Sequence, residues 1–193
     1  MKTRPLRTLD FDIENRPLSY WVPDRPTAEV TAIAACWADD PKSMKVWLLH
    51  PAMTNAQHRG EMERMLLGFK SMYDEADMVT GHYIRRHDLG IIQAGLVEWS
   101  LPRLEEKLTS DTRLDLGKFS DLPKTQENLA DLWSLAEAKL HMKQSMWREA
   151  NRLTVEGLVA TEARVRGDVT QHMALREGLI KSGMLGAPKT WTP

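Results

Sequence analysis

The first clear pattern in the chain is a strict alternation of apolar and acidic residues over residues 8–14. Successive side chains of a strand point to opposite faces, so this alternation predicts a half-buried strand with one acidic face. Two β-rich runs follow at residues 30–37 and 44–49, separated by an Asp-Asp-Pro-Lys-Ser turn. Together the three runs predict a β-meander. The apolar side of the first strand comprises Leu9, Phe11 and Ile13, and its acidic side comprises Asp10, Asp12 and Glu14.

Helical periodicity begins after the meander. Apolar residues recur every three or four positions along residues 58–73, which predicts an amphipathic helix. A short apolar run at 78–79 then predicts a strand, which leads through Gly81 to Asp88 at the start of a second helix.

The C-terminal half is expected to be mostly helical. Residues 112–116 predict one further strand, and much of 126–185 predicts helix, interrupted by Gly157, Gly167 and Gly183. Strands that come first and then alternate with helices favour an α/β fold. We expect one mixed sheet, built from a three-stranded antiparallel meander plus parallel strands and flanked by α-helices.

The composition is that of a globular protein. The 193 residues are 42% hydrophobic and 27% charged, and Cys36 is the only cysteine, so no internal disulfide can form. Repeats, low-complexity tracts and linkers are not evident in the sequence. We therefore expect a single domain over residues 1–193, with its core at about 8–185.

Net charge and hydropathy bear on whether the protein binds nucleic acid or enters a membrane. The net charge of −1 neither favours nor excludes nucleic acid, so phosphate binding would depend on local basic residues or bound metal. The longest apolar run, residues 32–38, is too short to cross a bilayer. We expect a cytoplasmic protein with no membrane partner.

Four acidic residues in three separate segments are the candidate metal ligands: Asp12, Glu14, Asp88 and Asp168. Hard divalent cations bind several carboxylate oxygens from different parts of a fold. Residues two apart on a strand share a face, so Asp12 and Glu14 can point at one cation. Each acid also has an ordinary structural interpretation. The first pair suits a solvated strand face, Asp88 a helix N-cap, and Asp168 an ion pair with Arg164.

The order and context of these acids resemble a known family. The segments concerned are Phe11-Asp12-Ile13-Glu14, Gly81-His82 followed by a basic stretch and Asp88-Leu89, and Gly167-Asp168-Val169. They resemble the motifs of the DEDD (DnaQ-like) 3′-to-5′ exonucleases, a branch of the ribonuclease H-like superfamily with small free-standing members in phages and bacteria. The resemblance runs from about Leu9 to Leu185. It implies a ribonuclease H-like sheet, and it implies that the four acids bind two divalent cations, Mg²⁺ or Mn²⁺.

The third motif departs from the family at the position of the attacking water. Family members carry a Tyr four residues before the final Asp or a His five residues before it, where this chain has Arg164 and Ala163. His172, one helical turn after Asp168, and His87 are therefore candidates to orient water. The alternatives are ordinary structural histidines and catalysis without a protein base.

Basic and aromatic residues supply the candidate substrate contacts. Arg164 can hold a phosphate oxygen with two hydrogen bonds. The others considered are Arg85, Arg86, Arg148, Arg152 and Arg166 for phosphates, and Tyr20 and Trp21 for stacking on terminal bases. Solvated helix positions and core aromatics are the alternative interpretation.

The resemblance therefore predicts a metal-dependent 3′-to-5′ exonuclease that acts on the 3′ end of single-stranded or frayed nucleic acid. DNA is favoured over RNA by the family alone. A binding module that kept the fold but lost efficient catalysis is the main alternative, because of Arg164 and Ala163. An acid/base hydrolase is less expected, because Asp12 and Glu14 are too close along the strand to flank a glycosidic bond.

Overall fold

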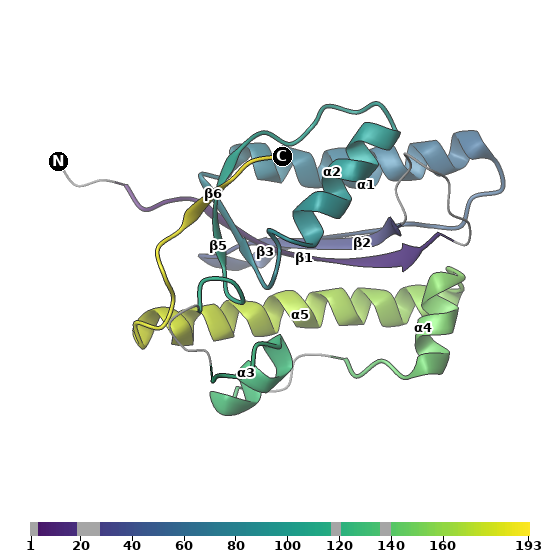
Figure 1. Ribbon diagram of the computed structural model, residues 1–193. Helices are drawn as coiled ribbons and strands as arrows, with labels where there is room; N and C mark the ends of the chain where they lie inside the picture. Colours follow the sequence, from purple (N-terminus) through teal and green to yellow (C-terminus); the bar gives the residue numbers. More distant parts are fainter. Residues whose placement is uncertain (1–3, 19–27, 117–120, 136–139) are drawn as a thin grey trace.

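A six-stranded sheet lies at the centre of the molecule, in the strand order β3-β2-β1-β4-β5-β6 (Figure 1). The computed structural model describes residues 4–18, 28–116, 121–135 and 140–193. The strands are β1 (Thr8–Pro17), β2 (Ala28–Trp37), β3 (Asp40–Leu48), β4 (Met78–Gly81), β5 (Lys107–Asp111) and β6 (Lys189–Trp191).

The sheet is mixed, as the sequence predicts. β1, β2 and β3 pair antiparallel and form the expected meander, whereas β4 pairs parallel with both β1 and β5. β6, which the sequence did not predict, pairs antiparallel with β5 at the edge. The α/β architecture expected from the sequence is thus confirmed.

Helices cover both faces of the sheet (Figure 1). α1 (Asn55–Glu75) and α2 (Asp88–Glu98) pack on one face, and the long α5 (Val155–Lys181) crosses the other, with α3 (Gln126–Leu132) and α4 (Gln144–Asn151) beyond it. None of the helices in the described parts of the chain is both long and apolar enough to cross a membrane.

The two faces of β1 serve different layers. Its apolar side belongs to the main core, where the Phe11 ring lies 4.9 Å from that of Phe69 in α1. Its acidic side faces α5. A second, smaller core forms there, in which Ala32 and Ala34 of β2 pack with Val165 and Val169 of α5. These small β2 side chains let α5 approach the sheet closely, which determines how near its polar residues come to β1.

Two expectations about the C-terminal half are wrong. Residues 112–116 form a turn, and the strand lies just before them, in β5. Gly157 and Gly167 lie inside the continuous α5, because tertiary packing overrides their low helix propensity. A Cβ at Gly157 would collide with the Glu149 carbonyl, so the glycine admits a close contact with α4. Gly183 does follow the helix end, at a φ of +67°.

Candidate metal centre

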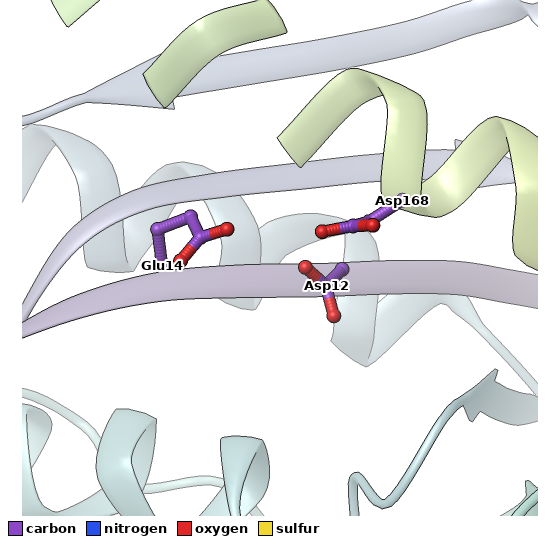
Figure 2. A group of neighbouring side chains, drawn as sticks. All are labelled: Asp12, Glu14 and Asp168. Carbon is purple, nitrogen blue, oxygen red and sulfur yellow. The ribbon is translucent and has the colours of Figure 1, made fainter. Parts of the chain in front are cut away.

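Three carboxylates meet between β1 and α5. Asp12 and Glu14 project from the acidic side of β1, and Asp168 projects toward them from the middle of α5 (Figure 2). One oxygen from each lies within 4.8 Å of the other two. Asp168 is buried, whereas Asp12 and Glu14 are half-buried. The register of β1 against β2 shifts between Glu14 and Asn15, opposite the extra residue Thr31 of β2.

Asp88 lies in the wall of the same cavity. The cavity measures about 340 Å³ and is lined by all four candidate ligands. The backbone N–H of Ile13 donates to Asp88 Oδ1 at 3.3 Å, which links the first turn of α2 to the segment between Asp12 and Glu14. The N-cap of α2 is His87, so Asp88 is a helical residue and the cap interpretation does not hold.

A cation of the protein lies among these carboxylates. Arg164 Nε is 2.8 Å from Asp168 Oδ2 and 3.4 Å from Glu14 Oε1. Its Nη1 donates to the Leu140 carbonyl at 2.8 Å. The buried Nε–H meets no acceptor with hydrogen-bonding geometry among the described residues, so charge rather than a directed bond joins it to the acids. The expected ion pair with Asp168 is present.

The loop before Asp88 is shaped by its neighbours. A Cβ on Gly81 would collide with the Ile84 side chain and lie 2.7 Å from the Phe11 carbonyl, so only glycine fits. Tyr83 adopts a φ of +73°, which is uncommon for a non-glycine residue. Asp111, at the end of β5, accepts the backbone N–H groups of Tyr83 and Arg85 at 3.0 and 3.1 Å. The loop position therefore depends on a carboxylate outside the predicted motifs.

The two histidines considered for orienting water lie in different places. His87 lines the cavity, and its Nδ1 is 3.4 Å from Asp88 Oδ2. The hydrogen bond with Asp88 raises the pKa of His87, against the opposing effect of burial.

His172 is in the interior, 2% exposed. Its Nδ1 contacts the Asp10 carboxylate at 2.7 Å and its Nε2 contacts Thr112 Oγ1 at 3.0 Å. Both ring nitrogens are thus occupied, and the described lining of the cavity does not include His172. This placement runs against the expected role of orienting water.

Arg85 is also engaged elsewhere. Its guanidinium donates two hydrogen bonds to Asp115, at 2.6 and 3.0 Å, and Asp115 is fully buried. Although burial opposes ionisation of Asp115, these bonds hold its pKa below the usual value. The geometry is that of a structural ion pair, and it runs against the expected phosphate contact.

The remaining candidates are scattered. Arg86 is exposed, and Arg166 pairs with Glu162 one turn away on α5. Tyr20 and Trp21 lie outside the described residues. Arg148 and Arg152 line a separate cavity of about 330 Å³ on α4, together with Gln144, Trp147 and Asn151.

Several cavity residues were missed by the sequence reasoning. Arg113 lies over the Tyr83 ring, 4.2 Å from its centroid, and Gln126 donates to the Asp168 carbonyl at 2.8 Å. His82 contacts Thr112 Oγ1 at 3.0 Å. His82 stands in the second motif without having been singled out, and the sequence signal for Arg113 was the polar run that begins with Asp111 directly after a β-rich segment. Such a run is typical of a turn that positions loops.

Fold and site together describe an α/β protein with an acidic cavity between its mixed sheet and a long helix. No protein-family model matches the sequence, and the search of curated proteins found no match. Among solved structures, the chain is similar to the family B DNA polymerase of the hyperthermophilic archaeon Pyrobaculum calidifontis, with a TM-score of 0.71 and 17% sequence identity.

The match covers 94% of this chain and 25% of the polymerase chain, so the protein spans about a quarter of that polymerase's length. At this identity the likeness shows the fold alone.

Proposed function

We propose that the protein is a metal-dependent 3′-to-5′ exonuclease, which hydrolyses phosphodiester bonds at the 3′ end of single-stranded or frayed nucleic acid, DNA in preference to RNA. The observation that carries the proposal is the meeting of Asp12, Glu14 and Asp168 within 4.8 Å. Asp88 in the same cavity wall supports it. The order of the motifs supports the same chemistry, and the fold likeness to a DNA polymerase supports an action on nucleic acid.

The residues present fit divalent metal. Carboxylate oxygens are the ligands that Mg²⁺ and Mn²⁺ prefer, and the four acids come from three segments, as a shared site requires. We expect Asp12, Glu14, Asp88 and Asp168 to hold two such ions. When bound, divalent cations supply activation of the attacking water and stabilisation of the leaving oxygen.

His87 is the better placed of the two histidines to orient water. Its side chain is 46% exposed and lines the cavity, whereas His172 is enclosed by Asp10 and Thr112. A ring that reaches the cavity can accept a hydrogen bond from water or substrate there.

The basic face of α4 is the proposed contact for the rest of the strand. Arg16, two residues after Glu14 on β1, donates to the Asn151 carbonyl at 3.0 Å and so ties α4 to the strand that carries the acids. The α4 cavity combines Trp147 with Arg148 and Arg152. Aromatic stacking and phosphate contacts of this kind bind single strands with little sequence preference.

The second candidate function is binding without efficient cleavage. Its supporting observation is Arg164, which lies against Asp168 and Glu14 at a position where the resembling family has a water-positioning Tyr.

A 5′-labelled single strand incubated with Mn²⁺ separates the two candidates. The exonuclease produces a ladder of shortened products, and Asp12→Ala removes it. A wild-type protein that binds the strand but leaves it intact with Mg²⁺ and Mn²⁺ contradicts the exonuclease and leaves the binding module. The same assay with a labelled RNA strand tests the preference for DNA.

A further inference from the structure

The Arg164 guanidinium lies beside Glu14 and Asp168, where the carboxylates would attract a divalent metal. We propose that its guanidinium is an internal counter-cation, which a divalent metal has to displace before the carboxylates can serve as ligands. The inference rests on the proposed function only for the identification of the acidic cavity as the metal site.

The first argument is electrostatic. Oxygens of Asp12, Glu14 and Asp168 lie within 4.8 Å of one another, so three ionised carboxylates would repel strongly without a nearby cation. Arg164 Nε is 2.8 Å from Asp168 and 3.4 Å from Glu14, and its side chain is only 17% exposed. The guanidinium therefore supplies positive charge inside the cluster, where little solvent is present to screen its attraction to the carboxylates.

The second argument is the closeness of the guanidinium to the place that a metal would occupy. Arg164 Nε lies within 3.4 Å of both Asp168 and Glu14, the two ligand candidates that it contacts. Divalent metal at Asp168 and Glu14 would bring a second concentrated positive charge against the guanidinium at a distance of a few ångströms. The side chain has to move away, so metal binding and the Arg164 ion pairs exclude each other.

The third argument concerns what holds the guanidinium. The hydrogen bond that the guanidinium makes among the described residues is donated by Nη1 to the Leu140 carbonyl, at 2.8 Å, and not to a carboxylate. The Nε that approaches Asp168 and Glu14 has no hydrogen-bond acceptor among the described residues. Since attraction to the acids is charge alone, a divalent cation competes for the same interaction and can replace it.

The chain offers a matched control on the same helix. Arg166 lies two residues further along α5 and pairs with Glu162, on an exposed surface where its side chain is 45% accessible. Arg164→Met and Arg166→Met change the net charge equally and both keep an unbranched side chain. A difference in metal affinity between the two variants therefore results from the position of Arg164 in the cavity and not from the change in net charge.

Isothermal titration with Mn²⁺ tests the proposal on the full chain. We expect Arg164→Met to bind Mn²⁺ about tenfold more tightly than wild type, and Arg166→Met to stay within about twofold. Arg164→Lys, which keeps the charge, should bind close to wild type. In EDTA, Arg164→Met should melt at a lower temperature than wild type, because Glu14 and Asp168 have lost the attraction of the guanidinium beside them. Circular dichroism establishes that each variant is folded, and Arg164→Gln replaces any that is not.

Equal Mn²⁺ affinity in the Arg164→Met and Arg166→Met proteins would overturn the proposal, and so would weaker binding by Arg164→Met. Absence of Mn²⁺ binding in every variant would overturn it together with the metal site. Tighter binding by Arg164→Met in a protein that cleaves no strand supports the proposal while contradicting the exonuclease.

Discussion

His172 Nδ1 lies 2.7 and 2.8 Å from the two carboxylate oxygens of Asp10, in the interior between α5 and β1. Asp10 precedes the metal-ligand candidate Asp12 by two residues, and His172 follows Asp168 by one helical turn. The buried pair therefore joins the same two elements that bring Asp12 and Asp168 together. The pair thus contributes to the cavity indirectly, because it holds β1 and α5 in the alignment that brings Asp12 and Asp168 together.

Loss of His172 should lower stability more than chemistry. His172→Ala leaves the Asp10 carboxylate buried at 1% exposure without its partner, so we expect the free energy of unfolding to fall by about 3–5 kcal/mol. Urea denaturation measures the change. His141→Ala, in which the lost side chain is 79% exposed, should change it by less than about 0.5 kcal/mol. Wild-type stability combined with a large loss of strand cleavage would instead assign His172 a role in catalysis.

Divalent cation should stabilise the folded protein. Ligand that binds only the native state adds about 2.7 kcal/mol at a hundredfold excess over its dissociation constant, so Mn²⁺ should raise the melting temperature. Asp168→Asn removes one of the clustered carboxylates and should abolish most of the shift. Asp131→Asn, at an exposed position on α3, is the matched control and should keep it. A thermal melt of the wild type that Mg²⁺ and Mn²⁺ leave unmoved would contradict the metal site.

Arg85 should prove structural. Arg85→Met removes two hydrogen bonds from the buried Asp115 carboxylate, which keeps Lys189 at 3.3 Å, and should cost about 3 kcal/mol of unfolding free energy. Arg86→Met, at the exposed neighbouring position, should cost little. Urea unfolding curves of the two variants make the comparison. Reduced single-strand affinity in Arg85→Met at unchanged stability would restore the substrate role.

The same pair predicts a pH dependence. The pKa of Asp115 is held below its usual value by Arg85, so its contribution to stability is complete above the unfolded pKa of about 3.9. That contribution is lost as the pH falls through the lower folded pKa. The stability difference between wild type and Arg85→Met should therefore be largest near neutral pH and shrink below about pH 4. A difference that stays constant into acid would exclude Asp115 as its source.

Gly81 should be intolerant of any side chain. In Gly81→Ala, the new Cβ meets Ile84 and the Phe11 carbonyl, so we expect a loss of about 1–3 kcal/mol and a displaced loop before Asp88. Gly90→Ala, inside α2, meets no described atom within 4 Å and should gain about 0.5–1 kcal/mol from the restricted unfolded chain. Thermal unfolding of both variants measures the two stability changes. Equal changes in Gly81→Ala and Gly90→Ala would contradict the close approach at Gly81.

The α4 face should contribute binding and not chemistry. Trp147→Ala removes an aromatic ring of the α4 cavity and should weaken single-strand binding by about 1–3 kcal/mol if a base stacks there. Arg148→Gln should also weaken single-strand binding, and the loss of affinity should be larger at low salt than at high salt. Fluorescence anisotropy with a labelled strand measures both, and Arg103→Gln, at an exposed position away from this cavity, is the control. Unchanged affinity in Trp147→Ala would remove α4 from the substrate path.

The sequence by itself determined the features that arise from local periodicity. Alternation over 8–14 specified β1 and placed Asp12 and Glu14 on one face, because side chains of a strand repeat every two residues whatever surrounds them. The spacing of apolar residues specified α1 in the same way. The order of strands and helices was sufficient for the α/β class.

Only the tertiary structure decided which side chains meet. The approach of Asp168 to β1 depends on the small residues Ala32 and Ala34 beneath α5, and a distance of this kind is set by packing between elements far apart in the sequence. The same packing encloses His172 against Asp10 and brings Arg164 against Glu14. Whether a polar side chain faces a cavity, the core or another charge depends on its neighbours in space, and for His172 and Glu14 those neighbours lie far away along the chain.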